Sequence, residues 1–392
     1  MTHRTQVAIV GGGPAGLMLS HILASYEIDT IVLERQTKDY VLGRIRAGVL
    51  EHGSVQMLRD FGLAERMEKQ GKAKDGTLIV WQDRDDHFID VKKWTGKNMW
   101  AWGQTYITED LYAARERDGG HIIDEAENVA LHDVEDKPHV TFTRHGEDYR
   151  IDCDFIAGCD GFHGPSRQAI PAEVRREYER VYPFGWLGIL TERPPLPEFV
   201  YSYHADGMAI AAQRNPMLSR YYVQVPNSDT IEDWSDDRFW EALLCRFPDN
   251  LSNQIQTGPS IEKSIAPLRS FVSEPLRWGK LFLAGDAGHI VPPTGAKGLN
   301  LAFSDVYYLS RALRVHYQEK SDHYLDSYSE MALRRIWASE NISWRLTKML
   351  HVFPGEDPFE QKIRENDYDL LLNSEPAQHA LAHEYIGLPF ED

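Results

Sequence analysis

The chain has 392 residues, of which 42% are hydrophobic, enough to bury a substantial core in two or three domains. Its formal net charge of -18, without a concentrated basic stripe, argues against a nucleic-acid partner because phosphate groups would be repelled. Cys153, Cys159 and Cys245 lack the paired spacing of a zinc site, so we expect structural thiols and no metal. The apolar start, VAIVGGG, is too short for a signal sequence or a membrane span and predicts a cytoplasmic protein.

The first predicted elements are a strand, a glycine turn, a helix and a second strand, in QVAIVGGGPAGLMLSHILASYEIDTIVLE, residues 6–34. Gly11, Gly13 and Gly16 match the dinucleotide fingerprint: the first allows a tight turn, the second lets pyrophosphate approach, and the third lets the helix pack closely. Helix amides starting near Ala15 would face the phosphates. Glu34 ends the second strand, where it would bind a ribose hydroxyl and repel a 2′-phosphate, so FAD or NAD is predicted here and NADP is not.

Two later segments place acidic residues after predicted strands. Asp160 follows the apolar run in DCDFIAGCDGFHGPSR, residues 152–167, and Asp286 follows the run 281–284 in GDAGHIVPPTGAKGLN, residues 285–300. Each Asp by itself is equally well explained as a turn former. Ligands bind at the carboxyl ends of parallel strands, so the three strand ends together favour a flavin. There is no second glycine fingerprint in the sequence.

Motifs along nearly the whole chain resemble the flavoprotein aromatic hydroxylases that act on 4-hydroxybenzoate. They are the opening glycine motif, LERQTKDYVLGRIRAGVLE, CDFIAGCDGFHG, VYPFGWLG, SRYYVQVP, EDWSDDRFW, EKSIAPLRSF, GDAGHIVPPTGAKGLN and YIGLPFED. The resemblance implies a mixed α/β fold with a Rossmann-like FAD-binding domain, an inserted sheet-rich substrate domain and a helical C-terminal region. The implied boundaries are 1–180 and 268–345 for the FAD domain, with 75–100 assigned to it or to the substrate domain, 181–267 for the substrate domain, and 346–392 for the helical region.

The resemblance also implies the residues that hold FAD. Asp286 would contact the ribityl chain, residues 292–300 would wrap the isoalloxazine, Lys297 would add a positive charge, and the amides near Leu299 and Asn300 would favour a reduced, negative flavin. The implied cofactor-binding residues are Gly11, Gly13, Ala15, Gly16, Glu34, Arg44, Arg46, Val49, Gln104, Asp160, Asp286, Lys297, Leu299 and Asn300.

The implied reaction is hydroxylation of 4-hydroxybenzoate to 3,4-dihydroxybenzoate with NADPH and dioxygen, through a flavin hydroperoxide. Tyr201 would bind the phenol and Tyr385 would pass its proton on; the implied catalytic residues are Tyr201, Tyr385 and Pro293. Arg214 would pair with the substrate carboxylate. The implied substrate-binding residues are Tyr201, Ala212, Arg214, Tyr222 and Pro293.

The electron donor lacks a fingerprint of its own, and the resemblance places it in a cationic cleft. The implied residues are Arg35, Gln36, Tyr40, Arg44, His163 and Arg269. Their charge favours NADPH over NADH, although Lys38 alters the same loop and leaves that preference open.

Two residues depart from the family pattern. Lys74 stands where related enzymes carry a proton-relay histidine, so water or another group completes the relay, or Lys74 points into solvent. Ala212 replaces a serine that helps to hold the substrate carboxylate. This leaves open another para-substituted benzoate (4-aminobenzoate or a dihydroxybenzoate), a non-oxygenating flavin oxidoreductase, or a flavoprotein without turnover.

The C-terminal run ALRRIWASENISWRLTKML, residues 332–350, has apolar residues at helical spacing. It is consistent with a dimer interface and equally with packing inside one copy. We expect a homodimer, with a small aromatic acid and dioxygen as the other partners and without nucleic acid or membrane.

Overall fold

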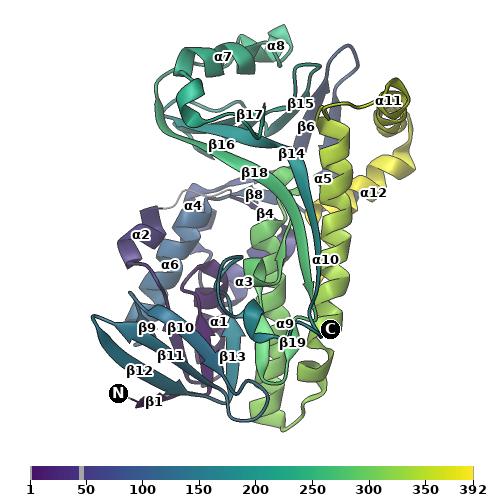
Figure 1. The fold of residues 1–392 in the computed structure, drawn as a ribbon. Coiled ribbons are helices and arrows are strands. Elements are labelled where there is room, and N and C mark those ends of the chain that lie inside the picture. Colours follow the sequence, from purple (N-terminus) through teal and green to yellow (C-terminus); the bar gives the residue numbers. More distant parts are fainter. Residues whose placement is uncertain (1, 44–47, 392) are drawn as a thin grey trace.

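The computed structural model describes residues 2–43 and 48–391, arranged around two large sheets (Figure 1). The first sheet has six strands in the order β19-β20-β13-β2-β3-β9. The strands from β20 to β9 are parallel, and β19 pairs antiparallel with β20. They are β2 (Val7–Val10), β3 (Thr30–Leu33), β9 (His121–Ile123), β13 (Phe155–Gly158), β19 (Arg277–Trp278) and β20 (Leu281–Leu283).

Every residue of β2, β3, β13 and β20 is buried, as expected for parallel strands that are covered on both faces. Helix α1 (Pro14–Ser25) packs against α6 (Gln104–Arg117) and α9 (Gly298–Glu319). A four-stranded sheet lies beside this core, in the order β1-β12-β11-β10. Its strands are β1 (Thr2–Arg4), β10 (Glu127–His132), β11 (His139–Arg144) and β12 (Glu147–Asp152).

The second large sheet has eight strands in the order β21-β18-β14-β17-β16-β15-β6-β7. Its longest strands, β14 and β18, pair antiparallel and run from the first sheet's side of the molecule into the second sheet (Figure 1). The strands are β6 (Gly76–Trp81), β7 (His87–Asp90), β14 (Arg176–Thr191), β15 (Val200–Tyr203), β16 (Ala209–Asn215), β17 (Leu218–Pro226), β18 (Ser260–Glu274) and β21 (His289–Ile290).

The two faces of the eight-stranded sheet bury different cores because side chains alternate along each strand. One core joins Tyr201, Ile210 and Ala212 to residues of α10 (His323–Leu350), α11 (Pro358–Asn373) and α12 (Glu375–Ile386). The other core lies under α7 (Asp236–Leu244). The C-terminal helices therefore cover the face that carries the predicted substrate residues.

The remaining strands, helices and 3-10 turns of the described residues are short. A three-stranded sheet has the order β4-β8-β5, and helices α2, α3, α4, α5 and α8 and four 3-10 turns lie between the larger elements. Their bounds are β4 (Val49–Leu50), β5 (Lys72–Lys74), β8 (Met99–Ala101), α2 (Lys38–Gly43), α3 (His52–Asp60), α4 (Glu65–Gln70), α5 (Val91–Thr95), α8 (Asp249–Ser252), η1 (Arg167–Ala169), η2 (Ile231–Asp233), η3 (Gly285–Ala287) and η4 (Pro293–Gly295).

The predicted mixed α/β class, with a Rossmann-like sheet, a second sheet-rich part and C-terminal helices, is confirmed. Within residues 2–43 and 48–391, every helix is too short or too polar to cross a membrane.

Candidate active site

The glycine turn between β2 and α1 is shaped by backbone contacts. Gly11 has a φ of 114°, and a Cβ there would lie 2.2 Å from the carbonyl oxygen of Cys159. A Cβ on Gly16 would lie 2.0 Å from the carbonyl oxygen of Gly11, whereas a Cβ on Gly13 would meet nothing within 4 Å. The turn thus needs Gly11 and Gly16 for its own packing. At Gly13 it leaves open space before the helix amides, which suits a pyrophosphate.

Glu34 closes the same turn from the end of β3. Its carboxylate accepts hydrogen bonds from the backbone amides of Gly12 and Gln36, each at 2.8 Å. Glu34, which we expect to bind the ribose, is therefore held beside the glycine turn by contacts with nearby backbone amides.

The acidic residues after β13 and β20 lie at the same edge of the sheet, because β20 pairs parallel with β13, which pairs parallel with β2. Asp286 is exposed. Asp160 accepts from the Ser166 amide at 2.8 Å through one oxygen, and its other oxygen is buried without a partner among the residues that the structure describes. Burial raises the pKa of Asp160. An open glycine, an exposed carboxylate and an unsatisfied carboxylate at one edge fit a polyhydroxylated dinucleotide.

The loop between β20 and α9 is fixed by Asp305. Its carboxylate accepts from the Gly285 amide at 2.8 Å and from His289 Nε2 at 2.6 Å. Burial by itself would lower the pKa of His289, but the Asp305 carboxylate holds it above its usual value. This buried pair sets the path of the segment that was predicted to wrap the flavin.

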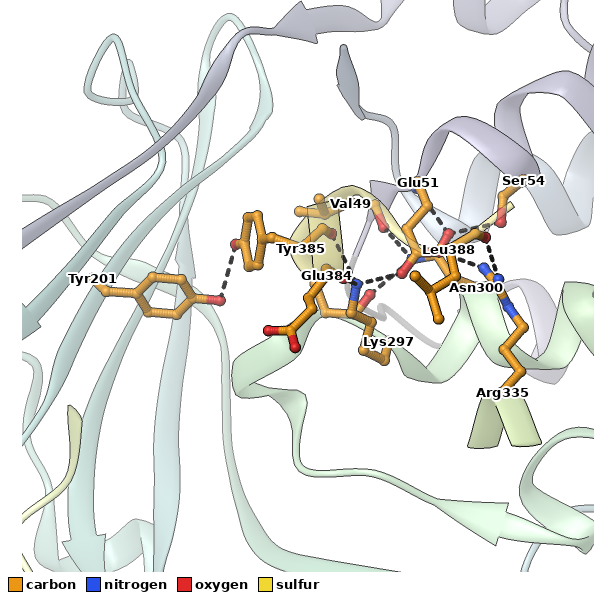
Figure 2. Close-up of polar contacts among 11 residues, drawn as sticks. Val49, Glu51, Ser54, Tyr201, Lys297, Asn300, Arg335, Glu384, Tyr385 and Leu388 are labelled. Carbon is orange, nitrogen blue, oxygen red and sulfur yellow. Dashed lines mark hydrogen bonds and ion pairs between the residues drawn. The ribbon is translucent and has the colours of Figure 1, made fainter. Parts of the chain in front are cut away.

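The side chain of Lys297 is engaged within the protein (Figure 2). Its ammonium group donates to Glu51 at 2.5 Å and to the carbonyl oxygens of Glu384 and Tyr385 at 2.9 and 2.8 Å. Burial lowers the pKa of Lys297, and Glu51 opposes that shift. The expected positive charge of Lys297 is therefore part of an ion pair.

Asn300 is engaged in the same way at the start of α9. Its side chain accepts from the Glu51 amide at 2.9 Å and from Ser54 at 2.7 Å, and donates to the carbonyl oxygens of Val49 and Ala296 at 3.0 and 2.7 Å. Leu299 is half-buried in the first turn of α9, where backbone amides lack intrahelical acceptors. Those amides are the part of this segment suited to a negative ligand.

Tyr201 and Tyr385 come together although they lie on β15 and α12. Their hydroxyl oxygens are 3.4 Å apart, and Thr77 donates to the Tyr385 oxygen at 3.2 Å. Tyr201 in turn donates to the carbonyl oxygen of Thr294. Burial raises the pKa of both tyrosines. The result is a continuous row of hydroxyls that ends at the loop after β21.

Pro293 does not meet Tyr201 as closely as its neighbour does. Pro293 is exposed, and its carbonyl oxygen accepts from the Ala296 amide at 2.9 Å, closing the turn η4. The carbonyl beside the Tyr201 hydroxyl belongs to Thr294. Sequence reasoning named neither Thr294 nor Thr77, because a backbone carbonyl and a strand threonine leave no pattern in a sequence.

The residues predicted to lie around the substrate carboxylate are on the sheet face that carries Tyr201. In the register of the sheet Tyr201 pairs with Ile210, Ile210 with Tyr222, and Ala212 with Arg220. The register shifts between Gln213 and Asn215, so the face of Arg214 is given by its contact with Tyr222, which lies in the same row as Tyr201. Arg214 is 9% exposed; among the described residues its guanidinium donates to the Gln213 carbonyl oxygen at 3.3 Å and also hydrogen-bonds the Tyr222 hydroxyl.

Arg214 is a buried cation without a carboxylate within 4 Å in the part of the chain that the structure describes; the nearby Arg220 takes Glu262 instead, at 2.7 Å. Burial lowers the pKa of Arg214, and the Tyr222 hydroxyl beside it opposes the shift. A buried charge is costly unless it is paired. An anion beside Arg214 would offset that cost.

Lys74 is mostly buried although it borders the surface, so it is not the freely solvated side chain of one alternative. It is 7% exposed and its ammonium donates to the Pro197 carbonyl. Burial, and then Lys72, lower its pKa. Lys74 lines a cavity of about 20 Å³ together with Thr77 and Gln213, and it also lines an open surface depression of about 530 Å³. The smaller of the two, the cavity of about 20 Å³, can hold about one water molecule.

The predicted electron-donor residues form two groups. Arg269 and His163 both contact the Phe162 ring, with centroid distances of 4.7 and 5.0 Å. The second group lies in the segment after β3 and comprises Arg35, Gln36 and Tyr40. The side chains of Arg35 and Tyr40 are exposed. Arg44 and Arg46 lie outside the described residues. Gln104 begins α6, half-buried.

Comparison with known proteins identifies the family of the chain. The FAD binding domain family matches residues 4–343. The chain is 47% identical to p-hydroxybenzoate hydroxylase of Acinetobacter baylyi, over 100% of this chain and 97% of that protein. It is 25% identical to 3-(3-hydroxy-phenyl)propionate/3-hydroxycinnamic acid hydroxylase 2 of Burkholderia vietnamiensis, over 78% of this chain and 55% of that protein.

Solved structures share the fold. p-Nitrophenol 4-monooxygenase PnpA from Pseudomonas putida aligns with a TM-score of 0.82 and 17% identity, covering 99% of both chains. The chain belongs to the FAD binding domain family and is a flavin-dependent monooxygenase that uses FAD and a reduced nicotinamide.

Proposed function

We propose that this enzyme hydroxylates 4-hydroxybenzoate to 3,4-dihydroxybenzoate, using NADPH and dioxygen. The observation that carries the proposal is the buried, unpaired Arg214 on the same sheet face as Tyr201. A rigid aromatic acid fits this arrangement, with its carboxylate on Arg214 and its phenol toward Tyr201. The 47% identical relative bears the name p-hydroxybenzoate hydroxylase.

We propose that FAD lies along the carboxyl edge of the six-stranded sheet. Gly13 and Ala15 would admit the pyrophosphate, Glu34 the ribose, Asp286 the ribityl chain, and the amides at the start of α9 the ring. Further contacts are proposed from Gly11, Gly16, Arg44, Arg46, Val49, Gln104 and Asp160. Bound FAD would supply hydride acceptance and the activation of dioxygen. The chain's own residues then have to orient the acid and hold its phenol proton.

The hydroxyl row would handle that proton. Tyr201 has a single hydroxyl hydrogen, which the Thr294 carbonyl accepts in this structure. A bound phenol would donate to the Tyr201 oxygen. If Tyr201 then donates to Tyr385, Tyr385 to Thr77 and Thr77 to water, each hydroxyl gains one hydrogen and passes one on, and the phenol proton moves toward the cavity beside Lys74. A water molecule in that cavity would bridge Thr77 and the buried ammonium. This favours a relay completed by water over a solvent-facing Lys74.

Arg214 offers the sharpest test. Replacing Arg214 with Met should raise the Kd for 4-hydroxybenzoate roughly ten- to a hundredfold, since a hydrogen bond to a charged group contributes about 1.5–3 kcal/mol. The ligand-free Tm should stay or rise, because an unpaired buried cation has been removed. The amide 4-hydroxybenzamide is the matched control, and its Kd should not change. Equal losses for acid and amide would remove the carboxylate from Arg214.

Turnover separates the remaining candidates. A hydroxylase of 4-hydroxybenzoate oxidises NADPH only when that acid is present and forms one hydroxylated product per NADPH. Preference for 4-aminobenzoate or a dihydroxybenzoate would identify a relative with a changed pocket, which Ala212 leaves room for. Oxidation without an acid would indicate a non-oxygenating flavin oxidoreductase.

We propose NADPH as the donor, held by Arg35, Gln36, Tyr40, Arg44, His163 and Arg269. Glu34 repels a 2′-phosphate from the FAD site, so the donor would bind elsewhere. The contacts of Arg269 and His163 with the Phe162 ring bring these two residues together, and Arg269 also pairs with Glu179 at 3.2 Å. A kcat/KM for NADH equal to that for NADPH would contradict the choice.

We also propose the domain division 1–180 with 268–345, 181–267 and 346–392. Strands β6 and β7 join the eight-stranded sheet, which supports counting 75–100 with the substrate domain.

A cytoplasmic location is proposed because Cys153, Cys159 and Cys245 are free thiols.

A homodimer is proposed through α10 and β14. Trp337 and Trp344 are 41% and 37% exposed and lie seven residues apart on one face of α10, and Val181 on β14 is 56% exposed. Charged substitution of Trp344 should then shift the mass in solution to that of one chain, by light scattering.

A further inference from the structure

A buried ion cluster of three side chains joins three separate parts of the chain (Figure 2). The Glu51 carboxylate, at the start of α3, accepts from Lys297 at 2.5 Å and from Arg335 of α10 at 3.0 Å. Glu51, Lys297 and Arg335 are 4%, 1% and 7% exposed. Two cations therefore share one buried carboxylate.

Both cations also bind backbone carbonyls at the end of α12. Lys297 donates to Glu384 and Tyr385, and Arg335 donates to Leu388. The last carbonyls of a helix lack intrahelical donors, and cations stabilise them. The guanidinium of Arg335 also lies 4.9 Å from the Phe390 ring centroid. The cations thus hold the chain on both sides of Gly387.

Gly387 shows how closely the carboxylate approaches this backbone. Its φ is 88°, and a Cβ there would lie 1.9 Å from Glu51 Oε2. Gly387 directly follows the last residue of α12. A larger residue there would force Glu51 or the end of α12 to shift. Tyr385 lies two residues earlier, and its backbone carbonyl is held by Lys297. Its hydroxyl oxygen lies 3.4 Å from the hydroxyl oxygen of Tyr201.

We propose that Arg335 is a positioning residue for Tyr385. The proposal rests on the proposed function, in which Tyr385 takes a proton from Tyr201. Helix ends fray unless they are capped, and a 3.4 Å contact between hydroxyls tolerates little displacement. Arg335 acts through Glu51 and the Leu388 carbonyl, and it holds the end of α12 so that the two hydroxyls remain in line.

The test variant is Arg335→Met, which keeps most of the side-chain volume. Removing Arg335 leaves Glu51 paired one to one with Lys297, so no buried charge becomes orphaned. Arg335→Lys is the conservative variant. Arg334→Met is the matched control, because Arg334 is its exposed neighbour on α10 and contacts the tail only at Glu391 among the described residues.

Two readouts separate positioning from simple stability. In Arg335→Met, product formed per NADPH at neutral pH should fall about tenfold, since misplacement by about 1 Å costs up to a hundredfold. The loss should shrink as pH rises toward the ionisation range of a free phenol, near 10, where the proton no longer needs a carrier. Amide hydrogen exchange in residues 381–391 should increase. Arg335→Lys should restore coupling to within about twofold, and Arg334→Met should match the parent enzyme.

Tyr385→Phe, measured in parallel, separates the two proposals. If Tyr385→Phe keeps full coupling, both the proton path and the positioning role are overturned. If Tyr385→Phe loses coupling and Arg335→Met does not, only the positioning role is overturned. Lower flavin content or Tm in Arg335→Met, with the remaining holoenzyme fully coupled at every pH, would also overturn it, as would unchanged exchange in 381–391.

Discussion

The proposed FAD site at the carboxyl edge of the six-stranded sheet and the proposed aromatic-acid pocket beside Tyr201 are built over very different distances along the chain. Gly11, Gly13 and Gly16 lie within two turns of one strand-helix junction, and Glu34 reaches back to the amide of Gly12. Tyr201 and Tyr385, which meet in the pocket, are 184 residues apart. The first site is fixed by the sterics of a short segment, and the second by strand register and by the docking of a C-terminal helix.

The difference predicts how each region responds to mutation. At Gly11 and Gly16 a single methyl group would meet backbone atoms, so damage to the fold and loss of the cofactor should occur together. The proposed catalytic side chains project from a completed strand, β15, and a completed helix, α12, so we expect that the chemistry can fail while the fold and flavin remain. Four predictions test this contrast, from the largest expected effect to the smallest.

Gly11→Ala should abolish flavin-bound protein. The new Cβ would lie 2.2 Å from the Cys159 carbonyl oxygen, at a φ of 114° that alanine rarely adopts. Gly13→Ala is the contrast, because its Cβ meets nothing within 4 Å and can disturb only a ligand. Apoprotein Tm and bound flavin absorbance measure the two effects. Equal apoprotein Tm losses for the two variants would contradict the division of roles.

Glu340→Gln probes the junction of the two regions. Glu340 of α10 interacts with Ser270 and Phe271 of β18, and burial raises its pKa from 4.5 to about 7. A raised pKa means that this group's contribution is fully present below about pH 4.5 and is lost as pH rises through about 7.

The loss is at most on the order of 3 kcal/mol, the free-energy equivalent of that shift. The glutamine variant should therefore lose less stability than the parent enzyme between about pH 4.5 and 7. Denaturant unfolding across this range checks it. Parallel curves for the two proteins would show that Glu340 does not titrate there.

Tyr201→Phe should separate chemistry from binding. The variant should bind acid and flavin and still consume NADPH, because the removed hydroxyl is needed only when the phenol must lose its proton. Hydroxylation should fall by about a hundredfold, the typical contribution of general acid–base assistance, with peroxide released instead. Product and peroxide per NADPH are the measurements; unchanged coupling would exclude Tyr201 from the mechanism.

Ala212→Ser should tighten binding of 4-hydroxybenzoate by about tenfold, the value of one added hydrogen bond to a carboxylate. Ala212 pairs with Arg220 on the face that carries Arg214, and it is 3% exposed. Flavin fluorescence titration gives the Kd, and the hydroxylated position should not change. Weaker binding would mean that the carboxylate does not lie beside Ala212, so that the space serves a bulkier acid.

The sequence by itself determined the mixed α/β class and the existence of a dinucleotide turn. Gly11, Gly16 and Glu34 could be interpreted because their contacts are local: a tight turn, a close helix and a strand end all depend on near neighbours. Tyr201, Arg214 and Tyr385 were assigned by resemblance, since nothing in their own neighbourhoods distinguishes them from ordinary strand and helix residues.

The tertiary structure decided which groups meet across long separations. It paired Lys297 with Glu51, added Arg335, put the Thr294 carbonyl beside Tyr201, and buried Lys74. None of these follows from pattern or spacing, because a buried ion pair depends on which elements pack together, and a carbonyl's direction depends on the path of its loop. Arg214 shows the same limit: its charge is visible in the sequence, but only the folded sheet leaves it buried without a carboxylate among the residues described, and the proposed binding of an acid rests on that burial.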